Sequence, residues 1–146
     1  MARRSFAISP AELENALKGW VVPGEMAAKW EGDRFQGAMV GLAHLMRHIA
    51  PIHLMCSPRD ISVTYHSRDP FTGRPTLILY DALPGGVGLS DRVYEMEMQP
   101  FREALDRLND CPCQGGCPSC VGVAAGAGAK RVLAEVLRAF LKEGDG

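Results

Sequence analysis

Four of the five cysteines fall within ten residues near the carboxyl end of the chain. They are Cys111, Cys113, Cys117 and Cys120, in the spacing C-x-C-x3-C-x2-C. Four thiolates make up the full ligand set of a closed tetrahedral zinc site, in which no position remains for a catalytic water. Gly115 and Gly116 lie between the two pairs and let the backbone turn so that both pairs face one ion. The spacing therefore predicts one structural Zn²⁺.

Three other uses of these cysteines remain open from the residues alone. The thiols could stay free in a reducing compartment, or Cys117 and Cys120 could form a redox disulfide. An iron–sulfur cluster also takes four cysteines as ligands. We carry zinc forward as the prediction, because four thiolates are its full set of ligands in a closed site. Such a site couples on the order of 10 kcal/mol of binding energy to folding. That is enough to order a connection between two helices that has little apolar core of its own.

The cysteine segment needs elements on both sides to hold it, and the sequence predicts a helix on each. Leu89 to Asn109 carries apolar residues at alternating spacings of four and three, the pattern of one helical face. Its stripe consists of Tyr94, Met98, Phe101, Leu105 and Leu108. Pro100 lies inside this stretch and predicts a kink or a break into two helices. A closing helix is predicted from Ala129 to Leu141.

Two short segments in the middle of the chain predict a β-hairpin. Ile61–Tyr65 alternates in polarity and is rich in β-branched residues, whereas Thr76–Tyr80 is a continuous apolar run. Asp69–Gly73 between them consists of residues typical of turns. Because the second segment is apolar on both faces, we expect it to lie at the centre of a small sheet.

The first third of the chain predicts two further helices. Residues Arg34 to Ile49 place Phe35, Met39, Leu42, Met46 and Ile49 on one face, and Pro51 is expected to end this helix because it lacks the amide hydrogen. An earlier helix is predicted from Pro10 to Lys18, with a loop from Gly19 to Glu25. The elements together predict an α+β fold, in which several helices pack on a small antiparallel or mixed sheet. The four-cysteine segment Cys111–Cys120, called the zinc knuckle below, lies between the last two helices.

Length and motifs limit the class of protein. A chain of 146 residues is the size of one domain, so we expect residues 1–146 to form a single unit. The chain has no G-x-x-x-x-G-K-[ST] loop, and it is too short to hold two nucleotide-binding lobes. Asp60 and Asp81 lie at strand boundaries without a paired nucleophile. The expectation is a protein that is not itself an enzyme.

Hydropathy predicts the compartment. No apolar run approaches the 18 residues that a membrane span needs, and no signal-peptide hydrophobic segment follows the arginines near the start. We therefore expect a cytoplasmic protein with no membrane partner.

A glycine-rich turn is a candidate phosphate site. The segment Pro84–Gly88 lies between a predicted strand and a predicted helix, so its amides and the helix N-terminus could hold a phosphate of DNA or a nucleotide. The glycines concerned are Gly85, Gly86 and Gly88. The turn lacks the lysine of a phosphate-binding loop, and the alternative is that its glycines only permit a tight strand-to-helix turn.

Several basic residues are candidates for contact with DNA phosphates. Sixteen Lys and Arg against seventeen Asp and Glu give a net charge of −1, so no global basic field holds nucleic acid, and any contact must be local or assisted by a partner. The candidates lie near the hairpin ends and just after the cysteines: Arg59, Arg68, Arg74, Lys130 and Arg131. Solvated surface charge is the alternative, because only clustering in the fold would concentrate the field.

Two of these motifs, taken in order, resemble a known family. Tyr80–Leu89 reads Y-D-A-L-P-G-G-V-G-L, and the C-P-C-x3-C-P-x-C knuckle begins some twenty positions later. The chain resembles the zinc-binding domain (DUF1998 type) at the C-terminus of superfamily 2 DNA helicases related to the bacterial mitomycin-repair helicase. The similarity also takes in His44 and Leu54–Ile61, and it covers roughly residues 36–122.

The resemblance implies a cofactor and partners. It implies that the four cysteines hold one zinc ion, and that the domain supports a motor which unwinds DNA by hydrolysing ATP during repair. The helicase motor domains would then be its partners, in the same chain or in a separate one, and DNA would be a second partner. Related domains also occur in phage-defence systems, which implies the alternative of a stand-alone scaffold or interaction subunit that partners a separate helicase.

Overall fold

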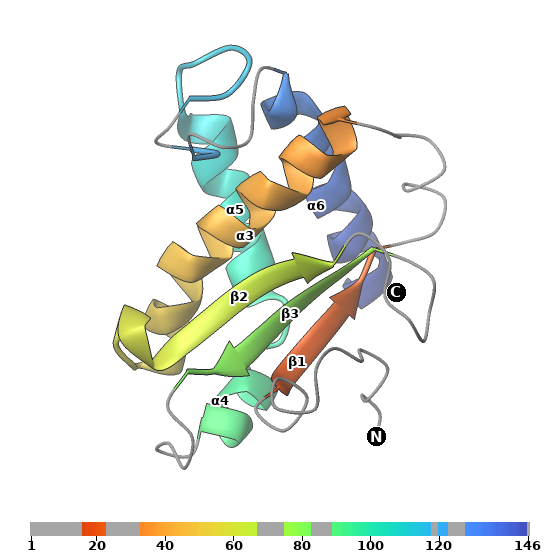
Figure 1. Cartoon of the computed structure of the whole chain (residues 1–146). Helices are drawn as coiled ribbons and strands as arrows, with labels where there is room; N and C mark the ends of the chain where they lie inside the picture. The colour runs from red at the N-terminus through yellow and green to blue at the C-terminus, as the bar shows by residue number, and fades with distance from the viewer. Residues whose placement is uncertain are drawn as a thin grey trace.

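The computed structural model describes residues 16–22, 33–66, 75–82, 89–117, 120–122 and 128–145. A three-stranded sheet lies against one layer of helices (Figure 1). The described helices are α3 (Asp33–Leu54), α4 (Leu89–Met96), α5 (Gln99–Asp110) and α6 (Ala129–Asp145), with the short 3-10 helix η1 (Pro58–Asp60) after α3. The predicted α+β class, with a small sheet packed by several helices, is confirmed.

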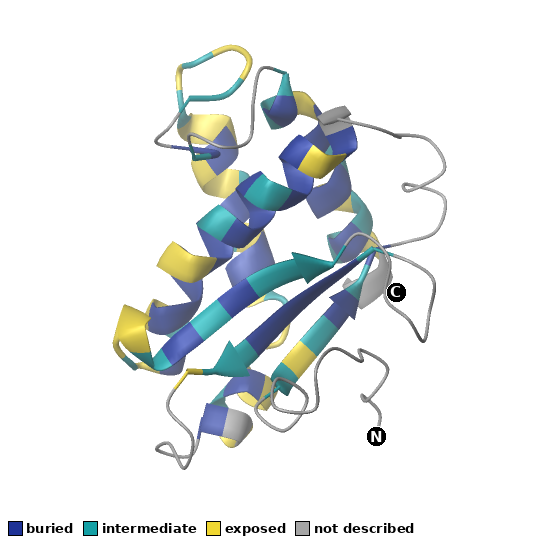
Figure 2. Ribbon diagram, viewed as in Figure 1, coloured by how far each residue is buried: buried dark blue, intermediate teal, exposed yellow. Residues whose placement is uncertain are grey.

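The sheet is antiparallel, with strand order β1-β3-β2. Strands β2 (Ile61–His66) and β3 (Thr76–Asp81) pair as predicted, with Val63 opposite Leu79. The predicted central position of β3 is also confirmed, because β1 pairs along its other edge and Leu77 and Leu79 are fully buried. Figure 2 shows buried positions along most of β3.

The prediction of a helix up to Lys18, followed by a loop, is wrong where the structure describes it. Strand β1 (Ala16–Val21) occupies these residues and pairs with β3, Trp20 lying opposite Leu77. Trp20 also packs on Phe101 of α5, with ring centroids 5.1 Å apart. Pairing to a distant strand and burial of an aromatic ring override the local helical preference. The beginning of the predicted helix lies outside the described residues.

Helix α3 carries the predicted buried face, since Phe35, Met39, Leu42, Met46 and Ile49 are all buried. Its predicted end at Pro51 is wrong, because the helix continues to Leu54. Contacts beyond the proline hold the last turn. Cys56 N donates to the Pro51 carbonyl oxygen at 3.1 Å, and Nη1 of Arg92 on α4 donates to the Leu54 carbonyl oxygen at 3.0 Å. These bonds satisfy carbonyls that would otherwise be orphaned at the helix end.

The predicted break at Pro100 is confirmed, because α4 ends at Met96 and Pro100 lies in the first turn of α5. The single apolar stripe across both helices is wrong at Tyr94, which is 83% exposed. Glu97, with φ of 50°, turns the chain between the helices, so each helix has its own buried face. Helix α4 buries Leu89, Val93 and Met96.

Helix α6 lies beside α3 and α5, and its predicted apolar stripe, Leu133, Val136, Leu137 and Phe140, is buried. The ring of Phe140 packs at a tilt against that of Phe101, with centroids 5.0 Å apart, which extends the aromatic contact that begins at Trp20. One apolar core therefore joins the sheet to the helices that carry the cysteine segment. Among the described residues, no helix has the length and apolar character needed to cross a membrane.

Candidate metal centre

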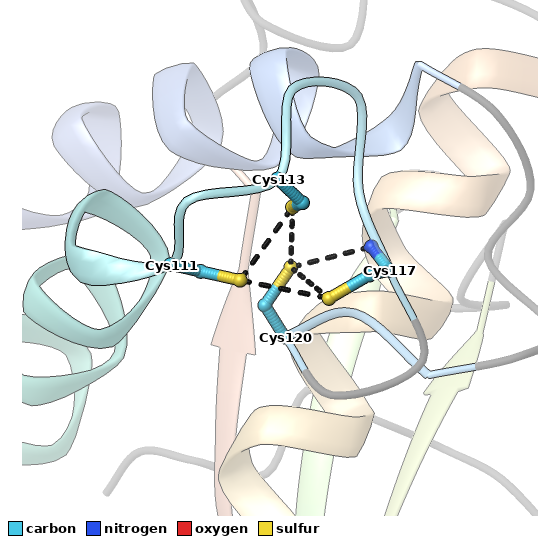
Figure 3. A group of neighbouring side chains, drawn as sticks. All are labelled: Cys111, Cys113, Cys117 and Cys120. Atoms are coloured by element: carbon cyan, nitrogen blue, oxygen red, sulfur yellow. Dashed lines mark hydrogen bonds between the residues drawn. The ribbon is translucent and has the colours of Figure 1, made fainter.

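The cysteine segment connects the end of α5 to the start of α6, as predicted. Cys111 is the C-cap of α5: its amide still donates to the Arg107 carbonyl oxygen at 3.2 Å, but its own backbone is extended, so the chain leaves the helix there. Cys113 and Cys117 follow in the connection, and Cys120 lies in a turn closed by a 3.0 Å bond from Val121 N to the Cys117 carbonyl oxygen. The four side chains point toward one another (Figure 3).

The sulfur positions match the geometry of a single tetrahedral ion. Four pairs of Sγ atoms are separated by 3.6 Å (Cys111–Cys113), 3.5 Å (Cys111–Cys117), 3.5 Å (Cys113–Cys120) and 3.7 Å (Cys117–Cys120). All four sulfurs lie within 4.8 Å of one another. Thiolates at about 2.3 Å from a tetrahedral zinc stand about 3.8 Å apart. The four cysteines are therefore positioned to hold a metal ion.

The same distances argue against two of the alternatives. A disulfide needs sulfurs at about 2.05 Å, and all five cysteines of the chain have free thiols. An iron–sulfur cluster distributes its cysteines over two or more irons, which holds the sulfurs further apart than around one ion. A single ion between the sulfurs fits the geometry best.

Gly116 shapes the connection between the two cysteine pairs. Its φ of +117° lies in a region that L side chains rarely adopt, and a Cβ there would lie 3.0 Å from Cγ2 of Val121. The amide of the next residue, Cys117, donates a hydrogen bond to Sγ of Cys120 at 3.4 Å. The turn therefore brings the second pair of sulfurs into range of the first.

Lys130 closes the centre from the side of α6. Its Nζ donates hydrogen bonds to the carbonyl oxygens of Cys111 (2.7 Å) and Cys113 (2.6 Å), and it lies 3.5 Å from Sγ of Cys113. The sequence indicated this residue by its charge as a candidate DNA contact and gave no sign of its contacts with the knuckle. No spacing signals such a contact, because it joins residues 17 and 19 positions apart.

Burial sets the proton affinity of the most enclosed ligand. It raises the pKa of the Cys120 thiol to about 12. For Cys113, burial also raises the pKa, but hydrogen bonds from Cys120 and Cys111 more than offset this effect and the pKa is lowered. Thiols bind metals as thiolates, so a cation entering the centre must displace the Cys120 proton.

Helix α3 supports the turn that follows Cys120. Gly122, with φ of +83°, lies against the ring of His44, and a Cβ at this position would come within 3.1 Å of that ring. The His44 ring stacks in turn on His48, with centroids 4.5 Å apart, and Nδ1 of His48 lies 2.8 Å from the His44 carbonyl oxygen. Helix α3, which is distant in sequence, therefore packs against the turn that follows the cysteines.

The predicted phosphate and DNA contacts fall in different parts of the molecule. Arg131 is exposed in the first turn of α6, beside the knuckle, whereas Arg59 is exposed in η1 at the opposite end of the molecule (Figure 1). The remaining candidates, Gly85, Gly86, Gly88, Arg68 and Arg74, lie outside the described residues. Lys130 and Arg131 are neighbours in the sequence, and the structure separates Arg59 from them.

A four-thiol centre between two helices of a small α+β domain places this protein in the class of structural zinc-binding domains. The chain belongs to the MrfA Zn-binding domain family, which its residues 42–121 match. Family membership and the converging sulfurs together confirm the predicted zinc cofactor.

Individual relatives agree with this family. The chain is 37% identical over 84 residues to the uncharacterized ATP-dependent helicase YprA of Bacillus subtilis, a match covering 58% of this chain but 11% of that protein. It resembles the crystal structure of the DUF1998 helicase MrfA bound to DNA, with a TM-score of 0.68 and 32% identity over 78% of this chain and 16% of that one. The chain thus spans a small part of these helicases.

A third relative differs in proportion. The uncharacterized protein MJ1572.1 of Methanocaldococcus jannaschii is 30% identical over 86 residues, and the match covers 57% of this chain and 77% of that protein. A similar domain therefore makes up most of a short protein.

Proposed function

We propose that this chain is a non-catalytic, zinc-stabilised accessory domain of an ATP-dependent DNA helicase that acts in DNA repair in the cytoplasm. In this role residues 1–146 form one unit, Cys111, Cys113, Cys117 and Cys120 bind one structural zinc ion, and the domain stabilises the motor and helps it to engage DNA. The observation that carries the proposal is the convergence of four sulfurs within 4.8 Å in a domain of the MrfA Zn-binding family.

The position of the centre supports a structural role for the metal. The connection between α5 and α6 is held by the cysteines, by Lys130 and by His44 of α3, so the ion would lock three helices to one another. Four thiolates fill a tetrahedral site and leave no position for substrate. The domain would then provide a rigid surface, and the motor would provide ATP hydrolysis.

A basic cleft beside the knuckle supports engagement of DNA. A cleft of about 670 Å³ lies between α5, the knuckle and α6, and Arg131 and Arg138 line it. Both arginines are exposed and stand about 10 Å apart along one face of α6, and with Lys130 they outnumber Glu135, the carboxylate that the structure describes in this cleft. Exposed guanidinium groups on one helix face can donate hydrogen bonds to phosphates of a nucleic-acid backbone.

The alternative is a stand-alone subunit that partners a separate helicase in a repair or phage-defence complex. The observation that favours it is the short archaeal relative, 77% of which is taken up by the match. Both versions share the zinc site and differ in how the motor is attached.

One experiment tests the proposal and separates these versions. The protein is purified from its natural host through an affinity tag, and its metal content, polypeptide mass and co-purifying ATPase activity are measured. One zinc per chain with a DNA-stimulated ATPase is expected, either in the same polypeptide or in a bound partner. Purification with zinc but without any ATPase would contradict the helicase role.

A further inference from the structure

Tyr94 is the most exposed of the large apolar side chains that the structure describes. It is 83% exposed on α4, whereas the other residues of this kind, Ile52 and Met55, are 61% and 74% exposed at the end of α3. Tyr94 makes no contribution to the apolar core that could account for its position. An exposed aromatic ring of this kind is available to an external ligand.

Tyr94 borders a cleft of about 390 Å³ that is lined by both apolar and polar residues. Trp20 of β1 and Met98, at the corner between α4 and α5, line this cleft. Trp20 is only 7% exposed. Its ring packs against the ring of Phe101, and that ring packs against Phe140. Packing therefore fixes the Trp20 ring in place, and Tyr94 lies exposed at the edge of the cleft.

The rim of the same cleft carries more positive than negative charge. Among the lining residues that the structure describes, Lys18 of β1 and Arg102 of α5 carry positive charge and Glu97 carries negative charge. Glu97 is an exposed residue with φ of 50°, a conformation that costs energy for a residue other than glycine. This turn orients α4 and α5 so that Tyr94 and Arg102 border one cleft.

The exposed Tyr94 ring, the apolar residues Trp20 and Met98, and the basic residues Lys18 and Arg102 together match the chemistry of one ligand class. The base of a nucleotide is flat and apolar on its faces, and the phosphate of the nucleotide is anionic, so the base can stack on an aromatic ring while cations contact the phosphate. A base in a duplex is already stacked and paired, and an unpaired base is free to enter a cleft.

We infer that this cleft, defined by Tyr94, Trp20, Lys18 and Arg102, is a binding site for an unpaired base of single-stranded DNA, with Tyr94 as the stacking platform. The inference rests on the proposed role beside a DNA helicase. It adds a site at the end of the molecule where α4 lies, away from the zinc knuckle (Figure 1).

The test compares an intact 20-nucleotide oligothymidine strand with a strand of equal length that carries abasic sites, using fluorescence anisotropy at low salt. The unmodified chain should bind the intact strand more tightly. Tyr94→Ala should weaken binding of the intact strand about 5- to 100-fold, the loss expected for one stacked base, and leave binding of the abasic strand unchanged. Tyr94→Phe, which keeps the ring, should restore binding.

Controls separate the site from folding and from backbone contact. Tyr94→Ala should keep the zinc content and melting temperature of the unmodified chain, because the side chain is exposed. Ile52→Ala removes another exposed apolar side chain and should leave binding unchanged. Lys18→Ala should weaken binding of both strands and lower the slope of log affinity against log salt by about 0.7.

Three outcomes would overturn the inference. Equal affinity of the unmodified chain for intact and abasic strands would show that no base is recognised, while leaving the proposed backbone contact in place. An unchanged affinity of Tyr94→Ala for the intact strand would show that Tyr94 does not stack on a base. Failure of both strands to bind at low salt would contradict both the base-binding site and the proposed contact of the domain with DNA. The zinc assignment does not depend on this result, because metal content is measured separately.

Discussion

Lys130 contacts Cys113 through two atoms of that cysteine. Its ammonium group donates a hydrogen bond to the Cys113 carbonyl oxygen at 2.6 Å and lies 3.5 Å from the sulfur. A metal bound by four thiolates carries excess negative charge, and a cation beside one of them offsets part of it. The first turn of α6 therefore contributes to the metal centre without supplying a ligand.

The first prediction concerns this lysine. Lys130→Met keeps most of the side-chain length but removes the donor and the charge, so it should lower the free energy of unfolding by about 1–3 kcal/mol and weaken zinc affinity. Urea denaturation and competition with a chromophoric chelator measure the two effects. Arg131→Met, at the exposed neighbouring position, is the matched control and should change stability by less than about 0.5 kcal/mol. Equal stability of the two variants would refute the role of Lys130.

The second prediction concerns the metal itself. The purified chain should contain one zinc, and Cys117→Ser should lose it together with a large part of the stability, because structural zinc binding couples on the order of 10 kcal/mol to folding. Elemental analysis and thermal denaturation with and without a chelator are the measurements. Cys56→Ser removes the remaining cysteine, which lies outside the cluster, and should keep the zinc. Iron and sulfide in place of zinc would contradict the assignment.

The third prediction concerns the basic cleft on α6. Replacing both Arg131 and Arg138 with Gln should weaken DNA binding at low salt uniformly across sequences. It should also lower the slope of log affinity against log salt by about 2 for duplex DNA, since each phosphate contact contributes about 0.9. Titration of labelled DNA at several salt concentrations measures this. A slope that does not change would place the phosphate contacts elsewhere.

The fourth prediction concerns pH and the pair formed by His53 and Glu103. A hydrogen bond from His53 at 2.9 Å is the main cause that lowers the pKa of Glu103 below its usual value of 4.5, and Arg107 at 2.8 Å adds to it. A carboxylate with a lowered pKa stabilises the fold at pH values above the usual one, and this contribution is lost as the pH falls through the lowered value. Glu103→Gln should therefore be less stable than the unmodified chain at neutral pH.

The difference in stability between Glu103→Gln and the unmodified chain should shrink in acid. Denaturant unfolding between neutral pH and pH 3 measures it. A difference that stays constant over this range would show that the pair does not link α3 to α5 electrostatically. Asp106→Gln, at an exposed position of the same helix, serves as the control.

The elements that could be predicted are those with a signal inside a short stretch of chain. The buried face of α3, the pairing of β2 with β3 and the break before Pro100 all follow from periodicity or from one proline. Strand β1 could not be predicted in this way, because Trp20 takes its conformation from β3 and from Phe101, which are distant in sequence. The same limit applies to Pro51, where Arg92 of α4 holds the helix end.

The sequence by itself determined the four thiol ligands and predicted zinc, since the types and spacing of four neighbouring cysteines are a local property and a tetrahedral ion imposes a narrow requirement on them. The sulfur positions in the structure then argued against a disulfide and an iron–sulfur cluster. Only the tertiary structure decided what surrounds that chemistry. It placed Lys130 on the knuckle, His44 under the turn and Tyr94 at the edge of a cleft, because each of these contacts joins residues that no short pattern connects. Contacts across the fold depend on how whole helices and strands pack, and that packing is set by the core as a unit.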